Sequence, residues 1–171
     1  TLTMSNTIIQ NCASYGLLLY AGAHVKAENC LIAKNGIHAF VVLEGGDFNF
    51  NNCHLVGYNE GGTAGAAVGI SNHFTRDGAT YLDDINEGTI TNSVIYGNVD
   101  YELVLDTIPE VGIVLNFDFR NNLIKSDIIP TDPIYDASNI WNVDPAFIDP
   151  SVYDFTYNTG AGAGPLHNTG G

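Results

Sequence analysis

Positively charged residues are scarce in this sequence. It contains 5 Lys and Arg residues against 19 Asp and Glu residues, which gives a net charge of −14 at pH 7. Nucleic acids, anionic membranes and polyanionic polysaccharides are bound largely through Lys and Arg, so nucleic acid is excluded as a partner and the other two are disfavoured. Charged residues of either sign make up 14% of the chain, against about 25% in typical domains. With 45% hydrophobic residues, the composition argues against a disordered tail.

The sequence also lacks long apolar runs, a helical period and an even number of cysteines. No run of about 18 apolar residues exists, so no transmembrane segment is predicted in this chain. Apolar residues do not follow a 3.6-residue period for more than about two turns, which disfavours a helical solenoid. The cysteines Cys12, Cys30 and Cys53 are three in number and form no complete disulfide framework. The sequence begins at Thr1 without Met or a signal peptide, so we expect a processed or truncated chain.

What the sequence does contain is a repeat. Five segments share the pattern apolar-x-apolar-x-Asn-small-x-aliphatic: Leu2–Ile9, Val25–Ile32, Phe48–Leu55, Gly88–Ile95 and Phe117–Ile124. The shared asparagines are Asn6, Asn29, Asn52, Asn92 and Asn121, and we call this set the asparagine column. They lie 23, 23, 40 and 29 residues apart, so two insertions interrupt a 23-residue period.

Each repeat predicts three short strands joined by turns. Alternation with a period of two before the asparagine indicates a strand, and asparagine favours a turn because it tolerates unusual backbone angles. A second strand follows, and a third is expected at Leu17–Tyr20 and at Phe40–Leu43. Three strands and three turns in 23 residues suit one rung of a parallel β-helix, in which identical residues of successive rungs stack. We expect the asparagine column to be continuous and to hydrogen-bond along itself.

The repeat resembles that of the right-handed parallel β-helix proteins related to pectate lyase. Asn121-Asn122-Leu123-Ile124 and the segment from Asn92 to Asn98 carry the resemblance, which covers residues 2–127. It implies an all-β, single-stranded right-handed parallel β-helix of about five 23-residue rungs in residues 1–127, with an insertion at about 59–87. The family includes lyases, hydrolases, epimerases, adhesins and inert surface proteins, so the resemblance implies a fold and not an activity.

A second resemblance lies in the tail. The segment from Asn142 to Pro150, followed by Asp154-Phe155, is similar to the Asp-Pro-x-Phe-x-Asp-Pro closing segment of β-helix proteins from the surface of Bacteroidetes-type bacteria. This implies a C-terminal capping segment at 128–171 and an extracellular or cell-surface, outer-membrane-associated location. That family often ends in Gly-Ser-Pro-Ala-Ile-Asp-Ala-Gly, whereas residues 162–168 here read Gly-Ala-Gly-Pro-Leu-His-Asn.

The predicted insertion holds the richest polar stretch. In one interpretation it is a substrate loop, with Asp83 and Asp84 as acid/base groups or calcium ligands and Arg76 holding a sugar acid. In the other it is a solvated surface loop, which we favour because the Asp-x-Asp-x-Asp-Gly calcium spacing is absent. No cofactor is therefore predicted, and calcium is the one alternative.

The third strand carries an apolar outward face. If Leu17 and Phe40 point inward, then Leu18, Tyr20, Val41 and Leu43 point outward on two adjacent rungs. Such a patch needs a cover, which the insertion, a partner protein or the face of a sugar on Tyr20 could supply. The predicted binding residues are therefore these four, together with Arg76, Asp83 and Asp84, and the predicted partner is another surface protein or a polysaccharide.

Catalytic groups find little support in the sequence. Lys26 and Arg120 are expected in outward salt bridges with their strand neighbours, and Glu102 and Asp106 flank an apolar strand as its ends. Cys30 and Cys53 fall in one column and are interpreted as small buried turn residues, with a disulfide or metal pair as the alternative. His54 stands in an aliphatic column without a nucleophile in register. We predict a non-catalytic binding or assembly module of a longer chain; the alternative is a carbohydrate-active lyase or hydrolase.

Overall fold

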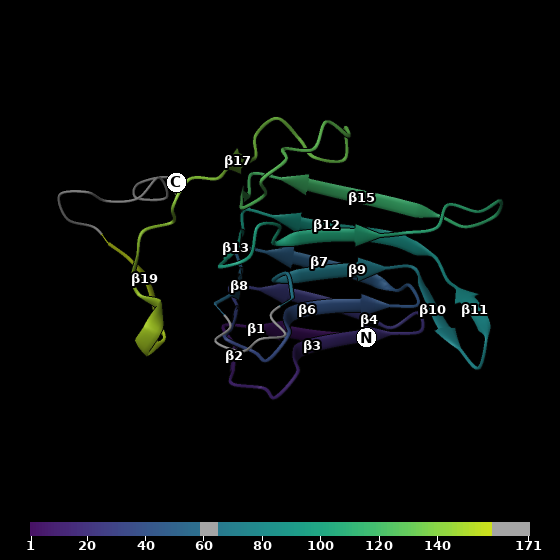
Figure 1. The fold of residues 1–171 in the computed structure, drawn as a ribbon, viewed down its shortest axis with the longest axis horizontal. Coiled ribbons are helices and arrows are strands. Elements are labelled where there is room, and N and C mark those ends of the chain that lie inside the picture. Colours follow the sequence, from purple (N-terminus) through teal and green to yellow (C-terminus); the bar gives the residue numbers. More distant parts are fainter. Residues whose placement is uncertain (59–64, 159–171) are drawn as a thin grey trace.

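The computed structural model describes residues 1–58 and 65–158, and its regular structure is almost entirely strand (Figure 1). The first sheet consists of β1 (Leu2–Ser5), β4 (His24–Glu28), β7 (Asp47–Asn51), β12 (Ile85–Thr91) and β15 (Leu115–Arg120). The second consists of β2 (Ile8–Gln10), β5 (Leu31–Ala33), β8 (His54–Gly57), β13 (Val94–Gly97), β16 (Leu123–Ile124) and β17 (Ile140–Trp141). The third consists of β3 (Tyr15–Tyr20), β6 (His38–Leu43), β9 (Val68–Ser71) and β14 (Leu103–Asp106).

The chain visits these three sheets in turn, so each of the first four rungs contributes one strand to each sheet. β15 and β16 add a fifth strand to the first and second sheets, and β17 adds a sixth strand to the second. All pairs within the three sheets are parallel, and they follow the predicted 23-residue register, as in Leu2↔Val25 and Val25↔Phe48. This confirms the predicted all-β parallel β-helix. In the described residues the only helical turn is the 3₁₀ turn η1 (Pro150–Val152), and no helix there is long and apolar enough to cross a membrane.

The asparagine column forms the turn between the first and second sheets. All five residues are exposed and have left-handed backbones with φ between 49° and 56°, which asparagine tolerates better than most residues. They follow paired positions of the first sheet, so the predicted stack is confirmed. The expected bonding along the column is seen where Asn29 Nδ2 donates to Asn6 Oδ1 (2.6 Å), whereas Asn92 Nδ2 donates to Asn51 instead.

The core lies inside the winding, where the inward residues of the three sheets meet. Phe40, Phe48 and Phe50 are fully buried, with ring centroids of Phe40 and Phe50 4.6 Å apart. The outward residues of the same strands are exposed or half-buried, as the period-two pattern predicts.

The predicted insertion at about 59–87 contains more rung structure than expected. Residues 59–64 lie outside the described residues. β9 within it pairs with β6 and β14 as the third strand of its rung. The projecting part is the antiparallel hairpin of β10 (His73–Arg76) and β11 (Ala79–Leu82), at the right of Figure 1.

The predicted capping segment at 128–171 divides into two described parts, and residues 159–171 lie outside the described residues. Residues 128–142 follow the last rung, where Tyr135 forms a parallel bridge with Phe119 and β17 extends the second sheet. The antiparallel hairpin of β18 (Phe147–Asp149) and β19 (Asp154–Tyr157) packs instead on the outer face of the second sheet, against Val56 and Val94. This second part therefore covers a side of the β-helix.

Candidate functional site

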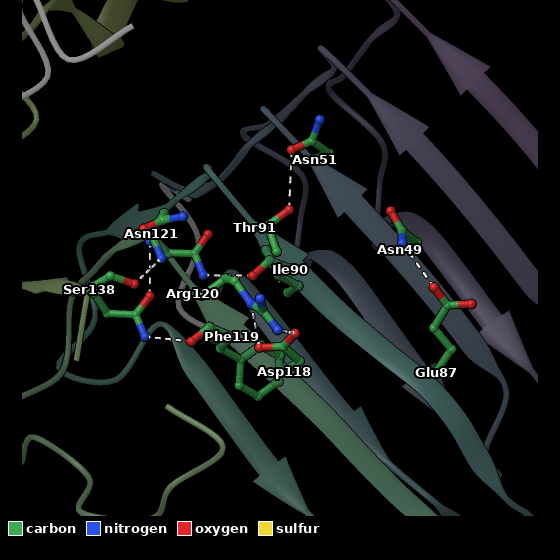
Figure 2. A network of polar contacts seen from close by, with 12 residues as sticks. Asn49, Asn51, Glu87, Ile90, Thr91, Asp118, Phe119, Arg120, Asn121 and Ser138 are labelled. Atoms are coloured by element: carbon green, nitrogen blue, oxygen red, sulfur yellow. Dashed lines mark hydrogen bonds and ion pairs between the residues drawn. The ribbon is translucent and has the colours of Figure 1, made fainter. Parts of the chain in front are cut away.

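The outer face of the first sheet is polar and carries an ordered network (Figure 2). Two rows of outward side chains run across its strands: Thr3, Lys26, Asn49, Thr89 and Asp118 in one, and Ser5, Glu28, Asn51, Thr91 and Arg120 in the other. Thr91 Oγ1 donates to Asn51 Oδ1 (3.2 Å), and Asn49 Nδ2 donates to Glu87 Oε1 (3.0 Å). Side chains of neighbouring rungs thus hold one another in place before any ligand arrives.

The expected ion pair of Arg120 forms on this face. Arg120 Nε donates to Asp118 Oδ1 (2.9 Å), and this hydrogen bond is the main cause of the raised pKa of Arg120. Both side chains belong to β15; that of Arg120 is exposed and that of Asp118 is half-buried, so the pair is a weak surface contact of the expected kind.

A cleft of about 1070 Å³ lies beside this network, at the corner between the first and second sheets. Asparagines of successive rungs line one wall: Asn29, Asn51, Asn52, Asn92 and Asn121. The opposite wall comes from β19 through Phe155, Thr156 and Tyr157. Glu28 and His54 also line the cleft. The cleft therefore combines a row of asparagines from the repeat with residues of the C-terminal hairpin, of which Phe155 is buried and Tyr157 half-buried.

His54 and Tyr157 join the two walls. Tyr157 Oη lies 2.5 Å from His54 Nε2, and the ring of Phe147 lies 5.5 Å from that of His54. Burial lowers the pKa of His54 to about 4 and raises the pKa of Tyr157 to about 12. Both groups are therefore neutral near pH 7, and their hydrogen bond positions the β19 wall rather than supplying an acid or a base.

A buried ladder supports the asparagine column from inside, one residue further along each repeat. In this ladder, the backbone N–H of each residue donates a hydrogen bond to a side chain of the next rung. The bonds are Cys30 N to Cys53 Sγ (3.4 Å), Cys53 N to Ser93 Oγ (2.9 Å), Ser93 N to Asn122 Oδ1 (2.9 Å) and Asn122 N to Asn139 Oδ1 (2.9 Å). Both cysteines are free and buried, which confirms their interpretation as small turn residues. Burial raises the pKa of Cys53 to about 11, so the thiol stays protonated.

The structure brings two of the predicted binding residues together on the third sheet. Arg76 Nη1 donates to Tyr20 Oη (3.0 Å), and the guanidinium lies 4.8 Å from the ring centroid of Tyr81. Phe74 packs edge-on against Tyr20, with ring centroids 5.8 Å apart. The β10–β11 hairpin therefore covers part of the outward face on which Tyr20 lies.

The other predicted binding residues differ in exposure and in their contacts. Val41 is buried and Leu43 half-buried, whereas Leu18 remains 45% exposed. Asp83 Oδ1 accepts from Asp84 N (2.8 Å), and Asp84 Oδ1 accepts from Val114 N (2.8 Å), so both carboxylates stabilise the return of the chain to the first sheet. In residues 1–58 and 65–158 no three His, Cys, Asp or Glu side chains gather as a metal site. A binding role for this face stays a prediction.

Glu102 directly precedes β14, at the end of the apolar strand where sequence analysis expects it, but its burial was not predicted. It is fully buried, and its carboxylate accepts from Ala67 N (2.7 Å) and Val99 N (2.9 Å). Burial raises its pKa to about 7. A Cβ at Gly57 or Gly97 would come within 2.8 or 2.3 Å of this carboxylate. Glycines at paired positions of β8 and β13 were the available signal that a large side chain fills this corner.

With the fold and these sites described, the chain can be compared with known proteins. The family model for the right-handed beta helix region matches residues 1–137, and the chain belongs to this family. Comparison with curated proteins and with solved structures gives no match. The match ends before β18, so the β18–β19 hairpin and the wall that it adds to the cleft lie beyond the family's shared region.

Proposed function

We propose that the chain is a non-catalytic binding module, extracellular or on a cell surface, that holds a neutral polysaccharide in the cleft between the asparagine column and β19. The observation that carries this proposal is the composition of the cleft walls. Each asparagine amide offers two donors and an acceptor, and the exposed hydroxyls of Ser138 and Thr156 offer both. Such groups match the hydroxyl-rich surface of a sugar chain.

Tyr157 supplies the second requirement of sugar binding. It lines the cleft and is half-buried, whereas Phe155 beside it is buried against Tyr58 and Phe147. An aromatic ring buries the apolar face of a sugar, and a tyrosine adds a polar group at its tip. Amides together with the ring of Tyr157 would hold both kinds of sugar surface at once.

The repeat gives the cleft a length that suits a polymer. Strands of neighbouring rungs are spaced about 4.8 Å apart, and lining asparagines come from the rungs of β4, β7, β12 and β15. A chain lying along the helix axis would meet a similar amide at every rung. The net charge of −14 favours a neutral chain over a polyanion.

The charges of the cleft favour binding over hydrolysis. Glycoside hydrolases use two carboxyl groups about 5–9.5 Å apart, whereas Glu28 is the one carboxylate among the described lining residues. His54 is neutral and engaged with Tyr157. The surface location is supported by the resemblance of the tail to the closing segment of bacterial surface proteins.

Affinity electrophoresis against a glucan, a xylan, a mannan and polygalacturonate tests the proposal. We expect retardation by at least one neutral polymer and none by polygalacturonate. Asn51→Ala combined with Asn92→Gly should weaken binding by about tenfold or more, since two hydrogen-bonding side chains are lost. Glycine tolerates the left-handed backbone of Asn92.

Asn49→Ala is the matched control. Asn49 lies on β7 beside Asn51, faces outward and is hydrogen-bonded, but it does not line the cleft. Equal binding by the control and the double variant would overturn the cleft as the site. Release of shortened sugar chains by the wild-type protein would overturn the non-catalytic role and favour the enzyme alternative.

A further inference from the structure

One charged side chain of the cleft has no partner. Glu28 is the last residue of β4, is exposed, and is the one carboxylate among the described lining residues. Lys26 also faces outward from β4, but no ion pair joins the two side chains, and the Glu28 carboxylate accepts no hydrogen bond in the part of the chain that the structure describes. An ionised carboxylate can only accept. Glu28 therefore offers the cleft a charged acceptor that the protein itself does not use.

The side chain next to Glu28 on the neighbouring strand offers a donor. Asn51 of β7 pairs with Glu28 in the register of the first sheet. Its Oδ1 accepts from both Thr91 Oγ1 (3.2 Å) and Asn92 Nδ2 (2.7 Å), and these two bonds orient the amide. Figure 2 shows its oxygen turned to Thr91 and its nitrogen turned away. Asn51 Nδ2 is thus a donor without a partner among residues 1–58 and 65–158.

An acceptor and a donor side by side select a group that can both donate and accept. Side chains on neighbouring strands lie about 4.8 Å apart. A hydroxyl that donates over about 2.7 Å and accepts over about 2.9 Å, with its two bonds near the tetrahedral angle, has its partners about 4.6 Å apart. A sugar hydroxyl therefore fits between Glu28 and Asn51, whereas an ether oxygen can take only the bond from Asn51.

We infer that Glu28 and Asn51 form the pair that determines the specificity of the cleft, and that its ligand is a polysaccharide with free, unsubstituted hydroxyl groups. This inference rests on the proposed function, because it concerns the same cleft. One sugar hydroxyl donates to the Glu28 carboxylate and accepts from Asn51 Nδ2. A sugar whose hydroxyl is O-methylated leaves the carboxylate without a donor where the ligand has displaced water. Sites built to bond a hydroxyl strongly reject analogues that lack it, since a polar group is left unpaired.

The same pair disfavours charged sugars of either sign. A protonated amino group only donates, so it would pair with Glu28 but would set its N–H groups against those of Asn51 Nδ2. A sugar carboxylate only accepts, so it would pair with Asn51 but would be repelled by Glu28. A hydroxyl meets neither conflict. The pair therefore favours a chain that is both neutral and rich in hydroxyl groups.

Affinity electrophoresis against a glucan, a xylan and a mannan, each in its native form and after O-methylation of most hydroxyls, tests the inference. For the polymer that wild type binds best, we expect the methylated form to bind about tenfold more weakly or worse. Glu28→Gln should lower this ratio by about threefold or more, because a glutamine amide can donate to the ether oxygen. It should also weaken binding of the native polymer, since a neutral acceptor forms the weaker hydrogen bond.

Glu87→Gln is the matched control. Glu87 is exposed on β12 of the same sheet and does not line the cleft, so this variant removes the same charge outside the site. It should keep the wild-type ratio. An equal ratio in wild type and Glu28→Gln would mean that the bulk of the methyl groups alone excludes them, and would overturn the inference while retardation by the native polymer upholds the proposed function. Retardation by none of the native polymers would overturn the proposed function and this inference with it.

Discussion

The outer face of the first sheet is polar and open, whereas the outer face of the second sheet is apolar and lies under the β18–β19 hairpin. Both faces arise from the same repeat and share one core. On the second sheet the outward residues include Ala33, Val56, Val94 and Leu123, all of them buried by the hairpin. The inward residues of the repeat thus form the core of the β-helix. The outward residues determine which faces are covered by other segments and which stay free to bind.

The sharpest test of this division substitutes an inward residue beneath the polar face. Phe50 on β7 is fully buried, and Phe50→Ala should lower the free energy of unfolding by about 3–5 kcal/mol through lost burial and a cavity. Urea denaturation measures the loss. Asn49→Ala, on the same strand but outward, should cost less than about 1 kcal/mol. Similar losses in the two variants would contradict the assignment of the two faces.

The next test opens the covered face. Phe147 packs against His54, Tyr58, Phe155 and Tyr157, and Phe147→Ala should destabilise the docked hairpin by about 3 kcal/mol. Amide hydrogen exchange in β18 and β19 should then quicken by about 100-fold, because exchange reports local opening. Amides of β7 serve as the internal control. An equal increase there would show that the hairpin and the β-helix open as one unit.

Acid should weaken the same contact through His54. Its pKa is lowered in the folded state to about 4, from 6.5. The neutral ring therefore contributes stability that is fully present above pH 6.5 and is lost as pH falls from there through 4, by about 3 kcal/mol. Thermal unfolding of wild type and His54→Phe across this window measures it.

The comparison with His54→Phe is needed because the ionisation of Glu102 changes stability with pH in the opposite direction. The pKa of Glu102 is raised to about 7, so its contribution is full below its ordinary value of 4.5 and is lost as pH rises through 7. Subtracting the two profiles removes this common part. A difference that stays constant from pH 7 to pH 4 would contradict the role of His54.

The smallest effect is expected on the open face. Thr3 is exposed and points outward from β1, so Thr3→Ala should change the free energy of unfolding by less than about 0.5 kcal/mol. Chemical denaturation would detect a larger loss. Such a loss would mean that the outer face of the first sheet contributes to folding and is not simply available for binding.

The winding itself was predictable because its signals are local and repeated. Alternating residues and a turn asparagine recur in five segments, and the register of the first sheet follows directly. β9 was missed because Val68-Gly69-Ile70-Ser71 is short and follows no asparagine turn of the repeat. A strand of four residues shows too little periodicity to be separated from the loop around it.

Half of the candidate cleft was predictable in the same way. The asparagine column follows from the repeat, but the opposite wall depends on contact between His54 and Tyr157, which lie 103 residues apart. Strands of the second sheet hold as few as two residues, so an apolar outward row does not stand out in the sequence. The burial of Glu102 likewise depends on two glycines outside its own strand, Gly57 on β8 and Gly97 on β13.

The buried ladder of Cys30, Cys53, Ser93, Asn122 and Asn139 has a direction. Each N–H group donates to a side chain one rung nearer the C-terminus, and the acceptors change along the way, from a sulfur at 3.4 Å to oxygens at 2.9 Å. Sulfur is the weaker acceptor, and a solenoid is held by nearest-neighbour contacts. Contact between the turns of Cys30 and Cys53 should therefore open more readily than contact between the turns of Asn122 and Asn139.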